Sequence, residues 1–184
     1  MEQRFDDLLV NHEGDRRALD DLFCATYDEL RRLATAVKRG DQQATLTPTA
    51  LVNEAWLKLA GSPQFAIASR LHFKRIAARA MRQVLIEAAR RRNASKRGGL
   101  NGIDITLDES FMSIDSSGDL IALDAALDDL ARMHPRQAQI VEARFFGGFS
   151  VAEIGELLSI SEATVLRDWR VARAWLSAEL RRQK

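Results

Sequence analysis

The chain has 184 residues, 46% of them apolar, and its 27 Lys and Arg nearly balance its 26 Asp and Glu. A chain of this size buries one modest hydrophobic core or two small ones. It carries neither a long apolar run nor a charged-then-apolar leader, so we expect a soluble, cytoplasmic protein without a membrane segment. Ala, Leu, Arg and Glu recur whereas Pro and aromatic residues are few, and this composition favours an all-α fold.

Residues that serve catalysis or metal binding are sparse. The single cysteine, Cys24, cannot form an internal disulfide, and its helical surroundings predict a small buried hydrophobe. His12, His72 and His134 are scattered, and the chain has no phosphate-binding Gly loop and no nucleophile motif. We therefore expect no enzyme activity, no cofactor and no metal site.

Charge is distributed unevenly along the chain. Residues 74–97 carry nine Lys or Arg against one acid, Glu87, whereas residues 100–130 carry eight Asp or Glu and no Lys or Arg. The last turns, from residue 167, are basic again. This asymmetry predicts two cationic surfaces separated by an acidic connector. Chance clustering of solvated charges is the alternative for either run taken alone.

The first helical block extends from about residue 5 to residue 93, with breaks at "NHEG", "RGDQQ" and "GSPQF". Within it, "TLTPTALVNEAWLKL" begins at Thr45 and leads into an apolar helical pattern. Thr47 precedes Pro48, which biases Thr47 to an extended backbone and suits it to cap a helix whose first residue is Pro48.

The stretch "SRLHFKRIAARAMRQVLIEAARRRNASKRGG" predicts one long helix. Cations near a helix C-terminus interact favourably with the helix dipole, but nine cations against one acid in residues 74–97 exceed that need. We therefore expect a nucleic-acid surface here. The cations lie off an apolar stripe formed by Phe73, Ile76, Ala77, Ala80, Met81 and Val84.

The middle segment "SKRGGLNGIDITLDESFMSIDSSGD" has Gly and Ser pairs and no sustained periodicity, so it predicts a flexible acidic linker without strands of useful length. A second helical block follows from about residue 120. "LDAALDDLARM" stops before Pro135, which can begin the next helix, and Gly147 and Gly148 end that helix.

The end of the second block predicts a helix-turn-helix. Ser150 and Glu153 form a capping box for the short helix "VAEIGELL", and "SIS" makes a turn in which Ser161 caps the last helix. A short helix, a three-residue turn and a longer basic helix favour DNA binding over a plain helical hairpin, the alternative. In the last helix Val165, Trp169, Ala172 and Leu176 share one face, whereas Thr164, Arg167, Arg170 and Arg173 occupy others.

The order and spacing of several segments resemble a bacterial RNA polymerase sigma factor of the extracytoplasmic-function group. The segments are "YDELRRLA", "LVNEAWLKL", "HFKRIAARAMRQVLIEAARRR", "KRGG" and "EIGELLSISEATVLRDWRVARAWL". The resemblance implies that residues 1–97 bind the polymerase clamp helices and the −10 element. It implies a linker at 98–119 and a helix-turn-helix domain at 120–184 that binds the −35 element. Core RNA polymerase and promoter DNA are the implied partners, and an anti-sigma protein would be a separate chain.

The resemblance also implies roles for single residues. The loop "GSPQFAIASRLHF" would capture a flipped −10 base, which requires stacking and hydrogen-bonding groups. For His72, packing is the alternative role. The implied −10 residues are Phe65, Ser69, Arg70, His72, Lys74, Arg75, Arg79 and Arg82. The implied −35 residues are Thr164, Leu166, Arg167 and Arg170, with Arg173 on phosphate.

Two residues of the last helix depart from the family's pattern. Leu166 stands where a cation is frequent, and Asp168 stands where Arg is frequent. Asp168 would either repel phosphate or hold Arg167 or Arg170 in position. The base preference is therefore left open.

The threonines mark another departure. Where the family usually carries acidic residues that dock on polymerase, this chain has Thr47, Pro48, Thr49 and Ala50, although Glu54 remains. The chain thus resembles a subgroup associated with Ser/Thr protein kinases, in which a phosphothreonine supplies the missing charge. Thr49 is the first candidate for phosphorylation. Thr47 is the second, because its hydroxyl would be engaged in capping the helix, and Thr45 is the third. The alternative is that all three are caps and surface residues. The implied polymerase-binding residues are Thr47, Thr49, Asn53 and Glu54.

A stand-alone helix-turn-helix transcriptional regulator is the alternative function. It predicts specific duplex binding without polymerase, and it leaves the long basic helix unexplained.

Overall fold

The computed structural model describes residues 16–38, 46–61, 69–95, 105–107, 112–114 and 117–182. The described residues are helical apart from turns and two short strands, which confirms the all-α class. The helices are α2 (Arg16–Lys38), α3 (Pro48–Ala60), α4 (Arg70–Ser95), α5 (Ser117–Met133), α6 (Pro135–Phe145), α7 (Val151–Leu158) and α8 (Glu162–Arg182).

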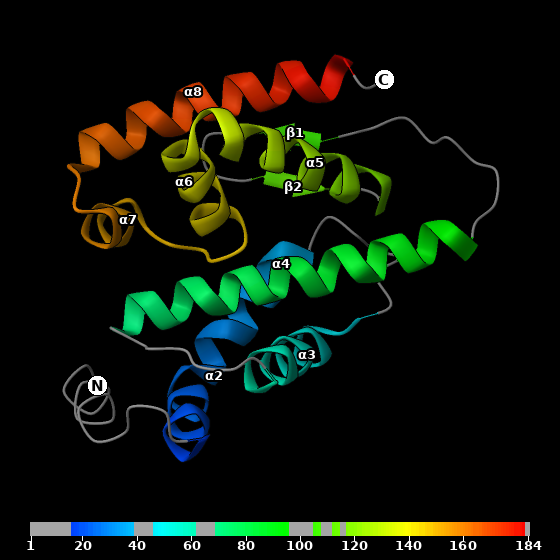
Figure 1. Cartoon of the computed structure of the whole chain (residues 1–184), viewed down its shortest axis with the longest axis vertical. Coiled ribbons are helices and arrows are strands. Elements are labelled where there is room, and N and C mark those ends of the chain that lie inside the picture. Colours follow the sequence, from blue (N-terminus) through cyan, green and yellow to red (C-terminus); the bar gives the residue numbers. More distant parts are fainter. Residues whose placement is uncertain are drawn as a thin grey trace.

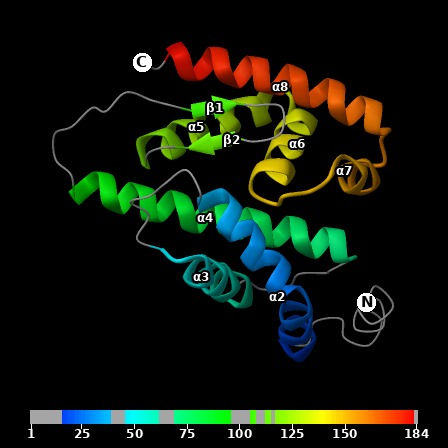
Figure 2. The same ribbon diagram turned by 180° about the vertical axis from the view of Figure 1, so that it is seen from behind.

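Helix α4 crosses the middle of the molecule, with α2 and α3 on one side and α5 to α8 on the other (Figures 1 and 2). We call α2, α3 and α4 the first helical group, and α5 to α8 the second. Each group has its own buried cluster of apolar side chains.

The predicted apolar stripe of α4 forms the core of the first group. Phe73, Ala77 and Met81 are buried there against Leu51 and Ala55 of α3. Residues three and four apart share one face of a helix, so the stripe packs as a continuous row.

The prediction that Cys24 is buried was wrong. Its side chain is exposed, because the buried face of α2 carries Leu22, Thr26 and Leu30 at intervals of four, and Cys24 lies on the opposite side.

The predicted short helix, turn and long helix are present at the end of the second group. Ser150 and Glu153 complete the capping box of α7, and Ser159 ends that helix with a left-handed backbone, φ 54°. The Oγ of Ser161 accepts a hydrogen bond from the backbone N–H of Thr164 at 3.2 Å, as expected of a cap. Val165, Trp169, Ala172 and Leu176 are buried, as their spacing predicted.

The middle segment contains structure that its composition did not predict. Strands β1 (Ile105–Leu107) and β2 (Met112–Ile114) form an antiparallel pair in which Thr106 lies opposite Ser113. Apolar and polar residues alternate in "IDITL" and "MSID", the period of a strand, but over runs too short to stand out.

The two helical groups are packed together, whereas we expected separate domains on a flexible linker. Ala78, Ile86 and Ala89 of α4 are buried in the core of the second group, beside residues such as Leu123 and Leu127. These three residues form a second apolar stripe on α4 that small side chains and intervening cations disguise. One helix therefore contributes to both cores.

Gly147 provides a test of the packing after α6. A Cβ atom here would lie 2.6 Å from the buried Phe149 ring and 2.7 Å from the backbone oxygen of Ala143. Because Phe149 is buried in the core, we expect Gly147→Ala to lower the free energy of unfolding by about 1–3 kcal/mol, as overpacking does. Gly61→Ala is the control, since its Cβ would come no closer than 3.4 Å to its neighbours. Urea unfolding measures both, and equal stabilities of the two variants would contradict the packing described here.

Candidate functional surfaces

The N-terminus of α3 has the geometry that "TPT" predicted. Thr47 is the N-cap with an extended backbone, and its Oγ accepts a hydrogen bond from the N–H of Ala50 at 3.1 Å. Pro48 is the first helical residue, and the first turn of α3 carries no acidic residue. The Thr47 side chain is thus engaged in capping, while Thr49 is half-buried beside it. Thr45 lies outside the described residues.

The outward face of α3 carries Asn53 and Glu54, both exposed. Leu57, one helical turn further along, is 67% exposed. The exposure of Leu57 was not predicted, because "LVNEAWLKL" is apolar as a whole. Its spacing from Leu51, Val52, Ala55 and Leu59, which are buried, was the signal that Leu57 points outward.

Helix α3 is fixed on α2 by aromatic stacking. The rings of Trp56 and Phe23 stack with centroids 4.5 Å apart, and Phe23 makes an edge contact with Tyr27 at 5.5 Å. The face that carries Asn53, Glu54 and Leu57 is thereby held in one orientation.

The start of α4 holds three of the residues implied for the −10 element. The Oγ of Ser69 accepts a hydrogen bond from the N–H of His72 at 3.1 Å, which caps the helix. Arg70 forms an ion pair with Glu29 of α2 at 2.9 Å. His72 is partly exposed, and burial together with the nearby charge of Arg75 lowers the pKa of its ring. Phe65 lies outside the described residues.

Lys74 is not the outward cation that its position off the apolar stripe suggested. Its side chain is 6% exposed, and its Nζ lies 2.9 Å from Glu29 and 2.8 Å from Glu153 of α7. The same Nζ lies 4.4 Å from the centre of the Phe149 ring, within cation–π range. Lys74 therefore joins α2, α4 and α7 through a single ammonium group.

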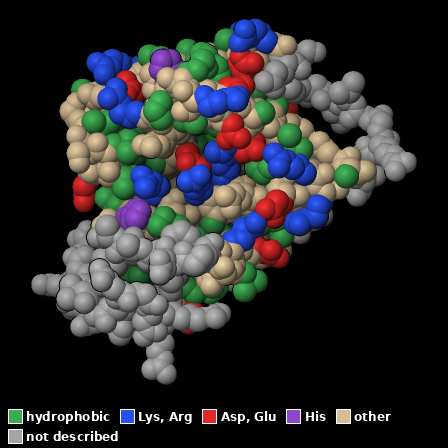
Figure 3. All heavy atoms as spheres, viewed as in Figure 1, with side chains coloured by type: hydrophobic (Ala, Val, Ile, Leu, Met, Phe, Trp, Pro, Cys, Tyr) green, Lys and Arg blue, Asp and Glu red, His purple; other side chains and the backbone are tan. Residues whose placement is uncertain are grey.

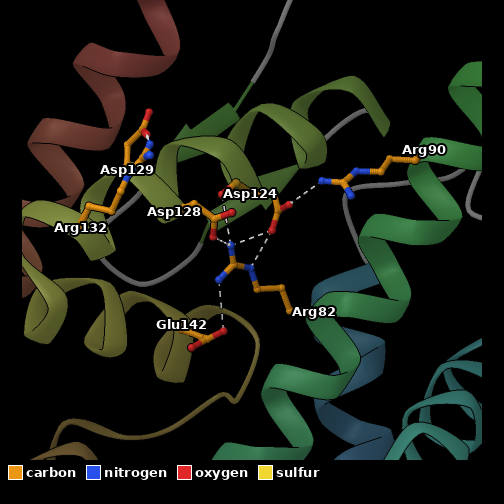
Figure 4. A network of polar contacts seen from close by, with 7 residues as sticks. All are labelled: Arg82, Arg90, Asp124, Asp128, Asp129, Arg132 and Glu142. Atoms are coloured by element: carbon orange, nitrogen blue, oxygen red, sulfur yellow. Dashed lines mark hydrogen bonds and ion pairs between the residues drawn. The ribbon is translucent and has the colours of Figure 1, made fainter.

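Arg82 is likewise turned inward and meets three carboxylates of the second group (Figure 4). Its guanidinium lies 2.7 Å from Asp124 and 2.8 Å from Asp128 of α5, and 3.3 Å from Glu142 of α6. It also donates to the backbone oxygen of Asp124 at 3.1 Å. Burial lowers the pKa of Arg82, but these carboxylates outweigh that effect, so its pKa is raised above the ordinary value.

The remaining cations of α4 point in several directions. Arg90 reaches Asp124 at 3.3 Å, Arg75 is half-buried, and Arg79 is exposed. Figure 3 shows basic and acidic side chains interspersed on one face of the molecule, where the charge pattern predicted a cationic surface. The excess of cations along α4 is thus partly balanced by acids of the second group.

The last helix presents the residues implied for the −35 element. Leu166, Arg167 and Arg170 are exposed, and Thr164 and Arg173 are partly exposed. The hydroxyl of Thr164 hydrogen-bonds that of Ser161 at 2.9 Å. These five residues lie off the face that α8 buries in the second core.

The structure explains Asp168, one of the two residues of the last helix that depart from the family's pattern. Its side chain is 5% exposed, and Oδ2 accepts a hydrogen bond from Nε of Arg136 of α6 at 2.8 Å. The same oxygen lies 2.7 Å from Nη2 of Arg136, so the two side chains form an ion pair. Arg167 approaches the other oxygen at 3.4 Å. Asp168 therefore holds two cations at the start of α6 and α8. Arg136 was missed because its partner lies 32 residues away, beyond the reach of local sequence patterns.

The described part of the chain shows no group of His, Cys, Asp and Glu able to hold a metal ion. None of the helices described is long and apolar enough to span a membrane.

The ion pairs of Lys74 predict a response to acid. Burial raises the pKa values of Glu29 and Glu153, but bonds and charges from their partners, chiefly Lys74, outweigh burial, and both pKa values lie below the ordinary 4.5. A lowered folded-state pKa stabilises the fold above the ordinary pKa, and this contribution is lost as the pH falls through the folded value. Neutral Gln at position 29 lacks this contribution. We therefore expect wild type to be more stable than Glu29→Gln at neutral pH, with the difference shrinking below pH 4.5.

Urea unfolding across the acid range measures that difference. Asp28→Asn is the control, because it removes the exposed carboxylate next to Glu29. A difference between wild type and Glu29→Gln that stays constant with pH would contradict the ionic role of Glu29.

Asp168 can be tested in the same way. Asp168→Asn leaves Arg136 facing a neutral amide, so we expect a loss of about 1–2 kcal/mol in the free energy of unfolding, less than for a fully buried pair because Arg136 is half exposed. Glu156→Gln, an exposed change on α7, is the control and should be close to neutral. Thermal or urea unfolding measures both variants. An unchanged free energy of unfolding in Asp168→Asn would show that the ion pair does not stabilise the fold.

Comparison with protein-family models identifies the family of the chain. The family model described as ECF sigma factor matches residues 3–182, nearly the whole chain. A search of curated proteins finds no match.

Proposed function

Because the chain belongs to the ECF sigma factor family, we propose that phosphorylation of Thr49 or Thr47 controls its docking on polymerase. Members of this family are not enzymes. They direct transcription initiation together with core RNA polymerase on promoter DNA. A protein with this role works in the cytoplasm, where polymerase is. A Ser/Thr protein kinase is the partner that the proposal requires, and an anti-sigma protein would be a further, separate regulator.

The observation that carries the proposal is the lack of an acidic residue in the first turn of α3, the helix whose counterparts in the family dock on polymerase. Thr47 and Thr49 occupy the positions of the usual acids, followed by the exposed Asn53 and Glu54. A phosphate adds about −1.5 to −2 charges and three acceptor oxygens. It would lie at the positive end of the helix dipole, where anions are favoured.

The capping geometry favours Thr49 as the acceptor. The hydroxyl of Thr47 receives the N–H of Ala50, so its phosphorylation would disturb the cap of α3. Thr49 makes no such contribution to the cap. Leu57, exposed on the same helix as Asn53 and Glu54, adds an apolar contact to the proposed docking face.

We assign the DNA-reading roles by the same family correspondence. Residues 1–97 bind the −10 element and the polymerase clamp, and residues 120–184 bind the −35 element. Residues 98–119 link these two parts of the chain. For the −35 element, the exposed Arg167 and Arg170 are the best-placed candidates for guanine, and Arg136 joins them because Asp168 fixes it beside α8.

The test is binding of the purified chain to core RNA polymerase before and after phosphorylation by a Ser/Thr kinase, with the modified residue mapped. We expect phosphorylation to tighten binding by about tenfold or more, because a desolvated phosphate can form several charge-assisted hydrogen bonds. Thr49→Ala should abolish the gain. Thr47→Asn, which keeps a capping side chain but cannot be phosphorylated, should retain it.

Thr35→Ala is the control, since the Thr35 hydroxyl bonds the backbone oxygen of Arg31 on α2, away from α3. Equally tight binding of the modified and unmodified chains would contradict the switch while leaving the sigma factor. A gain that survives Thr49→Ala but not Thr47→Asn would move the switch to Thr47.

A further inference from the structure

Two apolar side chains are exposed on α8, the long helix of the helix-turn-helix. Leu166 is 37% exposed and Val171 is 50% exposed, and neither belongs to a core of the chain. A single exposed apolar side chain is ordinary on a soluble protein. Within the described residues, however, two of the four large apolar side chains that are exposed lie five residues apart on this one helix. Both are therefore available to a partner outside the chain.

Exposed arginines stand beside both side chains. Arg170 lies four residues after Leu166, one helical turn away. Arg167 lies four residues before Val171, in the same relation. Asp168, the acid between them, is only 5% exposed. The surface around the two apolar side chains is thus cationic, and it favours a polyanion such as DNA as the occupant.

The outward side of α8 can also lie close against that partner. Ala163 and Ala174 are exposed there, four residues before and seven residues after Arg167, so small side chains flank the arginine on its own face. The second helix of a helix-turn-helix enters the major groove of DNA, and this groove is wide enough for one helix. Small neighbours let the backbone approach the bases, which brings the short side chain of Val171 within reach of their edges.

The major groove offers one apolar group, the C5-methyl of thymine. The other base edges present hydrogen-bond donors and acceptors, and burying these against Leu166 or Val171 leaves them without a partner, which costs free energy. A methyl group packed on either side chain instead removes apolar surface from water. The two residues therefore favour thymine, whereas a cation in either place would favour guanine.

From these features we propose that Leu166 and Val171 are specificity-determining residues of the −35 contact, each packed on the methyl group of a thymine. The −35 element of this chain then contains two T·A pairs beside the base pairs that Arg167 and Arg170 contact. This inference rests on the proposed binding of the −35 element by residues 120–184, but not on the proposed phosphorylation of α3.

The first measurement identifies the preferred duplex. The full chain and core RNA polymerase are mixed at concentrations that saturate their complex, so that phosphorylation is not required, and the complex selects from a library of duplexes of random sequence. We expect a common −35 element with thymine at two positions. Deoxyuridine, which differs from thymidine only by lacking the C5-methyl, then replaces each of these thymidines in turn.

Fluorescence anisotropy of the labelled duplexes measures the affinity of each complex. We expect deoxyuridine at either position to weaken binding of the wild type about fourfold, the effect of one methyl-sized apolar contact. Leu166→Ala should weaken binding to the thymine duplex by a similar factor and become insensitive to deoxyuridine at one position, and Val171→Ala at the other. Met133→Ala is the matched control, since it truncates an apolar side chain of α5 that is 51% exposed, and it should keep the full preference for thymine.

The remaining outcomes overturn the inference in distinguishable ways. If deoxyuridine binds as tightly as thymine throughout a common −35 element, or if Leu166→Ala and Val171→Ala keep the wild-type preference, this inference alone fails. If both variants lower the affinity of the chain for core polymerase, the two side chains dock on protein instead of DNA. If the complex forms but selects no common −35 element, the proposed role of residues 120–184 fails together with this inference.

Discussion

A largely buried guanidinium group between two cores constrains much of this structure. Removing Arg82 from water is costly unless close carboxylates and a backbone oxygen replace its hydration, and Asp124, Asp128 and Glu142 do so within 3.3 Å. This requirement fixes how α5 and α6 lie on α4. It also gives a purpose to acids that, in the sequence alone, resemble part of a solvated connector. The net charge of +1 thus hides a basic segment and an acidic segment that contact each other in the fold.

Helix α4 is consequently a shared element. One side carries the large residues Phe73 and Met81 into the first core, and the other carries Ala78 and Ile86 into the second. Helix α3, with its capping Thr47, rests on the first side, and α7, with its capping box, is tied to the second through Lys74. A change at α3 and a change at α7 therefore both act on the same helix.

Local rules predicted what local forces determine. The caps at Thr47, Ser150 and Ser161, the start of a helix at Pro48, and the buried face of α8 all follow from residues within a few positions of one another. The contacts that were missed join distant segments: Arg136 with Asp168, and Arg82 with the acids of α5 and α6. An Arg on a helix has the same local pattern whether it faces water or a carboxylate 42 residues away. The family correspondence implies roles for such residues, but not their partners within the chain.

The position of α4 also decides where this chain can be divided. Residues 98–119 separate two helical blocks in the sequence, so a cut there would seem to yield two modules. The second fragment, however, would lose Ala78, Ile86 and Ala89, and Leu123 and Leu127 would lose part of their cover. The first fragment would leave Arg82 without its three carboxylates. Chimaeras that exchange the two halves between relatives would therefore need to carry the matching side of α4, since the boundary between the cores passes through this helix rather than through the connector.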